Sequence, residues 1–187
     1  MAIYPLRKLP SQSVLPVIDA WIEQLEHEIT APQADRAEIC RRALCNLTFP
    51  AYASSWETAV RDESLPLSTR ASLMSLDPRN ITLEPEYYAE CDDEKFQRVK
   101  PLLWLWYSYD RTAMGGQNVE AGVRLRRMLA KYIFKRCGER FKSFQNVEFS
   151  FGYNMEVGDD VVDGALGRLD DVAVRRVPEH HRVDREQ

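Results

Sequence analysis

A six-residue period between residues 147 and 171 constrains the fold of this chain more than any other feature of its sequence. Three of the hexads begin with an apolar residue followed by a small or acidic one: Phe151-Gly152, Val157-Gly158 and Leu169-Asp170. Another apolar residue recurs at the fifth place: Met155, Val161 and Ala173. Repeats of this length build a parallel β-helix, in which the first residue of each hexad points into a narrow core and glycine turns the corner. The period therefore predicts short strands over residues 147–162, with turns near Gly152 and Gly158. If Gly158 has a positive φ at its turn, Gly158→Val should reduce folding stability.

The run Phe-Gly-Tyr-Asn-Met-Glu-Val-Gly-Asp-Asp, residues 151–160, resembles the opening coil of the hexapeptide-repeat acyltransferases, the family that includes the maltose and galactoside acetyltransferases. The resemblance implies a left-handed parallel β-helix that usually trimerises. It also implies transfer of an acyl group from coenzyme A to a hydroxyl or amine, with a histidine on a later coil as general base. No histidine lies in the repeats of this chain. The alternative is an accidental period, in which case the segment is an ordinary hairpin of two short strands around Gly158.

The same resemblance implies where substrates bind. Family members hold the acceptor with an Asn and an Asp early in the β-helix; Asp170 and Asp171 fall near the acidic position, whereas no Asn matches around residues 164–166. We therefore expect Asp170 and Asp171 to bind the acceptor, with acetyl-CoA or another acyl-CoA as co-substrate and no permanently bound cofactor. His180 and His181 lie outside the repeat pattern, so no catalytic residue is assigned. Full-length relatives are expected to be homotrimers.

Charge and cysteine usage narrow the class of protein. The net charge of −4 over 187 residues argues against general attraction to nucleic acids or anionic membranes. Four cysteines are scattered without a Cys-x-x-Cys pair, and the three histidines complete no zinc spacing, so reduced thiols and no metal site are expected. Residues 1–10 lack the apolar core of a signal peptide, and the most apolar run, residues 101–107, is too short to cross a bilayer. These features predict a cytoplasmic protein with no membrane partner.

The part of the chain before the repeats is predicted to be mainly α-helical. Apolar residues recur at three- and four-residue spacings over residues 13–30 and 34–47, which predicts two amphipathic helices packed as a hairpin. Residues 48–80 contain three prolines and several serines, and predict short helices and loops. A further helix is predicted from Asn118 to about Arg136, ended by Gly138 in the left-handed conformation.

Two charged segments invite functional interpretations. The acidic residues of the segment 84–94 are irregularly spaced, which favours a solvated face over a metal site. The aromatic run around Trp104 and Trp106 is typical of a protein core or of a contact with another subunit. A basic stripe follows: Arg124, Arg126, Arg127, Lys131, Lys135, Arg136, Arg140 and Lys142. It could contact a nucleic acid, but a solvated face that balances the acidic segment is the favoured interpretation.

The sequence thus predicts a mixed α and β fold, with a mainly α-helical region (1–143), the first coil of a left-handed parallel β-helix (144–171) and a disordered basic tail (172–187). Because one coil cannot bury a continuous core, we interpret the chain as a shortened or frame-altered, inactive acyltransferase that would transfer an acyl group from acyl-CoA to a small hydroxyl acceptor such as a sugar. The first alternative is a non-catalytic helical module that docks onto a protein through Trp104, Trp106 and the basic stripe. The second is a nucleic-acid-binding module that uses residues 124–142.

Overall fold

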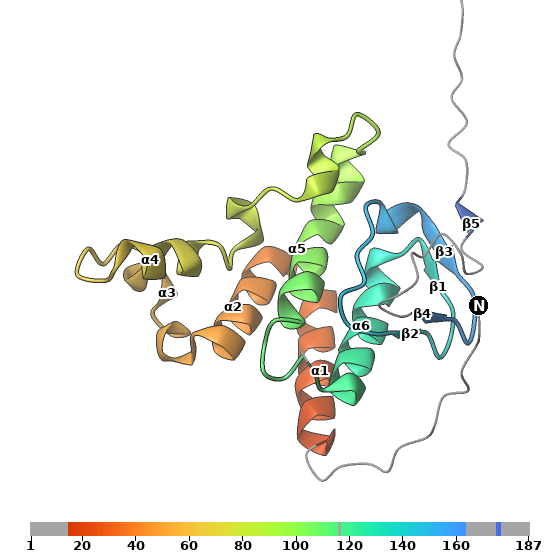
Figure 1. The fold of residues 1–187 in the computed structure, drawn as a ribbon, viewed down its shortest axis with the longest axis horizontal. Coiled ribbons are helices and arrows are strands. Elements are labelled where there is room, and N and C mark those ends of the chain that lie inside the picture. The colour runs from red at the N-terminus through yellow and green to blue at the C-terminus, as the bar shows by residue number, and fades with distance from the viewer. Residues whose placement is uncertain (1–14, 116, 164–174, 177–187) are drawn as a thin grey trace, which may run out of the picture.

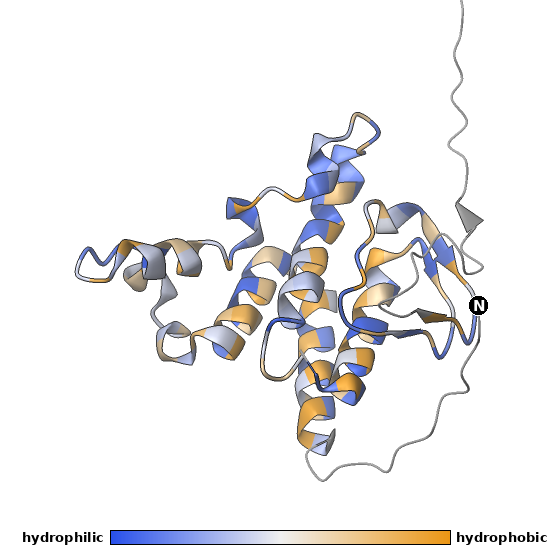
Figure 2. Cartoon of the chain, in the orientation of Figure 1, coloured by the Kyte–Doolittle hydropathy of each residue, from blue (hydrophilic) through white to orange (hydrophobic). Residues whose placement is uncertain are grey.

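The computed structural model describes residues 15–115, 117–163 and 175–176, which form a mixed fold dominated by helices (Figure 1). Its body consists of four longer helices: α1 (Leu15–Thr30), α2 (Arg36–Thr48), α5 (Asp93–Tyr109) and α6 (Val119–Ile133). Helix α5 packs against α2 and α6, and α1 packs against α2 and α6. Apolar and polar residues alternate around these helices (Figure 2), so each buries one face in a shared core.

Short polar side chains fix where three of these helices begin. Asp35, Asp92 and Asn118 each accept a hydrogen bond from the backbone amide three residues later, which satisfies an amide that lacks a partner within the helix. The helices predicted over residues 13–30 and 34–47 are confirmed within two residues, and they contact each other as expected. The structure also contains α5, which the sequence analysis did not predict as a helix.

The segment between α2 and α5 contains only short elements: η1 (Pro50–Tyr52), α3 (Trp56–Ala59), α4 (Leu67–Met74), η2 (Pro78–Asn80) and η3 (Glu84–Tyr87), where η denotes a 3₁₀ helix. Of these, α3 and α4 extend away from the body as an arm (Figure 1), whereas η2 packs against α2 and α5. The Trp56 indole donates a hydrogen bond to the carbonyl of buried Leu73, over 2.8 Å, which ties α3 to the end of α4. The prediction of short helices and loops is confirmed.

Among the described residues that follow α6, there are five short strands: β1 (Arg136–Cys137), β2 (Lys142–Ser143), β3 (Met155–Val157), β4 (Val162–Asp163) and β5 (Arg175–Arg176). Strand β1 pairs in parallel with β3, β2 pairs in parallel with β4, and β5 pairs antiparallel to β3. The two strands that flank Gly158 do not pair with each other. The hairpin alternative is therefore wrong, because each of these strands pairs with a segment that precedes residue 144.

Both parallel pairs have the same sequence offset: Arg136 is opposite Glu156 and Lys142 is opposite Val162, 20 residues apart in each case. The backbone between the strands repeats as well, since Arg140 and Asp160 have φ values of 58° and 57°. The Arg140 guanidinium donates two hydrogen bonds of 2.7 Å to the Asp160 carboxylate. The chain therefore stacks residues 136–143 on residues 156–163, position by position.

The two stacked segments share an aromatic core with the helices. Phe141, Val157 and Val161 are buried, and the Phe134 ring packs against Phe141 with centroids 5.7 Å apart. The Trp106 indole donates a hydrogen bond of 3.0 Å to the Val147 carbonyl. This contact attaches the C-terminal end of α5 to the chain between β2 and β3.

Glycine serves a different purpose here from the one predicted. Gly158 does not adopt a positive φ, and a Cβ atom added to it would meet no atom within 4 Å. Gly138 does not end α6 either: that helix stops at Ile133, and Phe134 is already extended. A Cβ on Gly138 would lie 2.3 Å from the backbone carbon of Gly158. Gly138 is thus needed because the two stacked segments approach each other closely at this position.

Candidate functional site

A groove of about 1000 Å³ opens on the surface where the helices meet the stacked strands. Four elements line it: the start of α2, the first half of α5, the end of α6 and the 3₁₀ helix η4 (Gly152–Asn154). Tyr153 and Asn154, from the Gly-Tyr-Asn motif, belong to the lining. The groove therefore joins the sequence motif to three helices that lie far from it in the chain.

Positive charge dominates the groove. Four cationic side chains line it, Arg36, Lys95, Arg98 and Lys135, against the single carboxylate of Asp35. The Asp35 carboxylate accepts the N-cap hydrogen bond of α2 and lies 3.4 Å from Arg79, so its charge is already engaged.

Two of the four cations form ion pairs at the edges of the groove. Lys95 pairs with Asp92 over 2.8 Å, and Lys135 pairs with Glu156 over 2.9 Å. Arg98 is exposed and forms no ion pair with any residue in the described ranges. The groove keeps an excess of positive charge even when these two pairs are counted as neutral.

Tyr153 is the most buried polar side chain of the groove wall. Its hydroxyl accepts a hydrogen bond of 3.0 Å from the Asp92 amide, and its ring lies 6.0 Å from the Lys95 ammonium. Burial raises the pKa of Tyr153, so the phenol stays protonated at neutral pH. The motif is thereby fastened to the N-terminus of α5.

Behind the groove, the buried guanidinium of Arg126 joins the helices to the strands. It pairs with Asp110 and donates a hydrogen bond of 2.9 Å to the Ser143 carbonyl, while Asp110 accepts one of 2.8 Å from the amide of Asn146. Burial raises the pKa of Asp110 and lowers that of Arg126, since both charges are removed from water. Gly122 provides the space, because a Cβ there would lie 2.5 Å from the guanidinium. We assign this pair a structural role.

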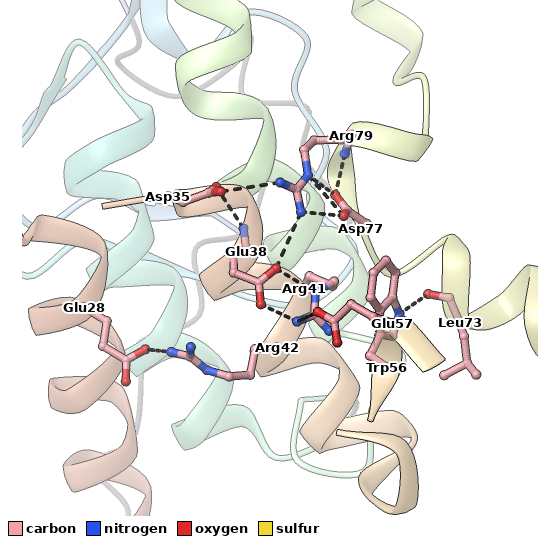
Figure 3. A network of polar contacts seen from close by, with 10 residues as sticks. All are labelled: Glu28, Asp35, Glu38, Arg41, Arg42, Trp56, Glu57, Leu73, Asp77 and Arg79. Atoms are coloured by element: carbon pink, nitrogen blue, oxygen red, sulfur yellow. Dashed lines mark hydrogen bonds and ion pairs between the residues drawn. The ribbon is translucent and has the colours of Figure 1, made fainter. Parts of the chain in front are cut away.

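A second polar network joins α2 to the arm (Figure 3). Arg41 pairs with Glu38, lies 3.6 Å from Glu57 and stacks 4.3 Å from the centroid of the Trp56 ring. The sequence pattern placed Arg41 on the polar face of its helix, whereas its side chain is only 4% exposed. One of its terminal nitrogens, Nη1, is buried without a hydrogen-bond partner among the described residues.

Arg79 occupies the other end of this network (Figure 3). It pairs with buried Asp77 over 2.7 Å and also approaches Asp35 and Glu38, at 3.4 and 3.5 Å. Burial alone would raise the pKa of Asp77, but the hydrogen bonds and charge of Arg79 hold it below its ordinary value. The network therefore links the arm and η2 to the start of α2 through charged contacts.

The basic stripe is largely paired, but not with the acidic segment. Its ion pairs reach α1 and the stacked strands: Arg124 to Asp19, Lys131 to Glu26, Lys135 to Glu156 and Arg140 to Asp160. Arg126 is buried, so the interpretation of the whole stripe as a solvated face is wrong for that residue. In the acidic segment Glu86 is not fully solvated either, because it accepts hydrogen bonds from the Leu83 amide and the Lys100 ammonium.

The aromatic run belongs mainly to the core. Trp106 is fully buried, and the hydroxyl of Tyr107 donates a hydrogen bond of 2.8 Å to the Phe149 carbonyl. Trp104 is half-buried against the same core. Trp106 therefore cannot dock onto a partner, which removes one residue on which the interaction hypothesis depended.

The predicted acceptor-binding residues, Asp170 and Asp171, lie outside the described residues, as do His180 and His181. Within the described ranges, no group of three or more His, Cys, Asp and Glu side chains could hold a metal ion. All four cysteines are free thiols, and burial raises the pKa of Cys40 to about 12. No described helix combines the length and apolar composition that crossing a bilayer requires.

Sequence analysis did not identify the groove. Its cationic residues come from three separate helical regions, and no local spacing relates Arg36 to Arg98 or Lys135. Of the features that the sequence pattern singled out, the Gly-Tyr-Asn motif and Lys135 of the basic stripe belong to its walls. Comparison of the chain with protein-family models, with curated proteins and with solved structures found no match.

Proposed function

We propose that the segment from Arg136 onward is the start of a left-handed parallel β-helix and that the chain is an acyltransferase of the hexapeptide-repeat type. The observation that carries this proposal is the constant offset of 20 residues between paired strands and between the two positive-φ corners, Arg140 and Asp160. In a parallel β-helix each coil lies on the previous one with the chain running in the same direction, so that equivalent positions recur at a fixed interval.

If the 20-residue offset is the length of one coil, that coil consists of three six-residue sides plus two extra residues. Buried Phe141 and Val147 are six apart, as are buried Met155 and Val161. The step from Val147 to Met155 is eight, and η4 lies within it. The two extra residues are thus placed at the corner that carries the Gly-Tyr-Asn motif, and the other corners keep the six-residue spacing.

The chemistry proposed for such a fold is acyl transfer from acyl-CoA to the hydroxyl of a small acceptor such as a sugar. That reaction needs a general base within hydrogen-bond reach of the hydroxyl and a donor to the thioester oxyanion. The described part of the two coils contains no histidine, and the one histidine in the described ranges, His27, lies on α1. We therefore propose that the chain recognises acyl-CoA and does not turn it over efficiently.

Thermal unfolding with acetyl-CoA tests this proposal, with 3′-phospho-ADP as the matched control because it has the whole nucleotide of coenzyme A but lacks the acylated pantetheine arm. At ten times its Kd a ligand adds about 1.4 kcal/mol to the free energy of unfolding, which is roughly 3–6 °C in Tm for a chain of this size. We expect acetyl-CoA to stabilise the protein more than 3′-phospho-ADP does at equal concentration. Equal or smaller stabilisation by acetyl-CoA would refute acyl-CoA recognition.

A further inference from the structure

We propose that the groove between α2, α5, α6 and η4 binds a small molecule that carries a diphosphate group. Free nucleoside diphosphates and coenzyme A both present this chemistry. The proposal depends on the groove alone and stands whether or not the chain transfers acyl groups.

Two arginines from different helices supply the main recognition chemistry. Arg36 is positioned by a hydrogen bond of 3.2 Å from its Nε to the Ile29 carbonyl, and its guanidinium lies 5.9 Å from the centroid of the Tyr132 ring. Within the described ranges no hydrogen bond engages its two terminal nitrogens. A planar guanidinium held in this way can donate two parallel hydrogen bonds to a phosphate.

Arg98 offers a second guanidinium from the α5 side of the groove, and it is exposed. Lys95 and Lys135 add two ammonium groups, each held near the groove by a carboxylate at its edge. Charges from α2, α5 and the end of α6 thus converge on one space. A ligand with two adjacent phosphates could contact cations on more than one wall.

The size of the groove and its aromatic residues indicate a ligand larger than inorganic phosphate. Its volume of about 1000 Å³ is in the range of sites for cofactor-sized molecules. The lining includes Tyr132, Phe134 and Tyr153, which can contact a planar or apolar group attached to the phosphates. The Tyr132 hydroxyl already donates a hydrogen bond to Glu26 over 2.8 Å, so this ring is fixed in place.

A small molecule fits these observations better than a nucleic acid. The chain carries a net charge of −4, and ion pairs already engage the Arg124 and Lys131 side chains of the basic stripe. An extended phosphate backbone would need a continuous row of available cations. The groove instead gathers four cations from separate helical regions around one space, which suits a compact ligand.

Isothermal titration calorimetry at physiological ionic strength tests the proposal with four probes: ADP, coenzyme A, inorganic pyrophosphate and adenosine. We expect ADP and pyrophosphate to bind and adenosine to bind at least about tenfold more weakly than ADP, because charge-assisted hydrogen bonds supply most of the affinity. Tighter binding of coenzyme A than of ADP would identify coenzyme A as the source of the diphosphate. Equal or weaker binding would identify a free nucleotide, and both results support the diphosphate site.

Substitutions locate the site. Arg98→Gln should weaken ADP binding about tenfold, and Arg36→Gln should do so as well. Arg61→Gln removes the same charge from an exposed residue outside the groove and should leave the affinity unchanged. Absence of ADP binding, equal binding of adenosine and ADP, or equal losses in Arg98→Gln and Arg61→Gln would each overturn the proposal. Tighter binding of a single-stranded oligonucleotide than of ADP would overturn it in favour of a nucleic-acid surface.

Discussion

At the scale of single residues, two arginines that sequence patterns place on the surface are structural. Arg126 has 1% of its side chain exposed and Arg41 has 4%. Helical periodicity could not reveal this, because it assigns a charged residue to the polar face by residue type and carries no information about the distant side chains that pair with it. The partners that allow burial, Asp110 and Ser143 for Arg126 and Trp56 for Arg41, lie 15 or more positions away in sequence.

Replacement of Arg126 with Met should destabilise the protein strongly. The change preserves most of the side-chain volume but leaves the Asp110 carboxylate buried without its cation, and breaking a buried pair in this way costs about 3–5 kcal/mol. Urea denaturation measures the loss. The exposed Arg61 provides the matched control, and Arg61→Met should change the free energy of unfolding by less than about 0.5 kcal/mol. Similar losses of unfolding free energy in the two variants would contradict the structural role of Arg126.

Asp77 should make stability depend on pH in the acid range. Its pKa in the folded protein is held below the ordinary value of 3.8 by Arg79, so folding favours the ionised carboxylate. This stabilisation is present above the ordinary pKa and is lost as the pH falls through the lower folded value. Asp77→Asn should therefore be less stable than the parent at pH 7, and the difference should narrow by pH 3. Free energies of unfolding that differ equally at both pH values would exclude this linkage.

At the scale of elements, the sequence predicted those helices whose apolar residues follow one clear period. The helices over residues 15–30 and 36–48 were predicted in this way. Helix α5 was not predicted, because Pro101 and the closely spaced aromatic residues interrupt the helical period of its apolar residues. Its start was visible in principle, since Asp92 is followed by two acidic residues in the first turn.

The six-residue period predicted strands after residue 147 but not the strands with which they pair. It predicted short strands and turns over residues 147–162, and the structure contains β3 and β4 there. It did not predict β1 and β2, although Cys137-Gly138 and Phe141 repeat the pattern of Val157-Gly158 and Val161, because the two extra residues at η4 place the copies 20 residues apart and out of a six-residue register. The groove could not be predicted for a related reason: its residues become neighbours only after α2, α5 and α6 have packed.

Because the stacked segments approach each other closely at Gly138 but not at Gly158, replacing each glycine with alanine should affect the free energy of unfolding differently. Gly138→Ala should destabilise the protein by roughly 1–3 kcal/mol, because its Cβ would collide with the backbone of residue 158. Gly158→Ala should be neutral or slightly stabilising, because its Cβ would meet open space and its φ is negative or extended. Thermal unfolding of both variants measures the difference. A larger loss for Gly158→Ala would reverse the assignment of which glycine the stacking requires.

At the scale of the whole molecule, helices and stacked strands form one continuous core, with Trp106 and Phe134 at the junction. In the proposed parallel β-helix this arrangement would close the first coil, because an end left open would expose apolar residues and unpaired strands. Helix α6 lies against β2 and covers that end. The helical region thus has a structural reason to precede the strands.

The chain should not transfer acetyl groups to sugars above background. General-base catalysis contributes about a hundred- to ten-thousand-fold, and residues 147–171 contain no histidine to provide it. A thiol-release assay with acetyl-CoA and a panel of sugars measures the rate. Turnover that disappears in the His180→Ala, His181→Ala double variant would contradict this expectation and assign the base to that pair.

The central claim is that residues 136–143 and 156–163 are successive coils of one parallel β-helix, and NMR scalar couplings across hydrogen bonds test it most directly. In the structure the Gly138 amide donates to the Val157 carbonyl over 2.8 Å, and the Lys142 amide donates to the Val161 carbonyl over 2.9 Å. We predict couplings from the Val157 carbonyl carbon to the Gly138 nitrogen and from the Val161 carbonyl carbon to the Lys142 nitrogen. Couplings that instead join β3 to β4 across Gly158 would show a local hairpin and contradict the stacked coils.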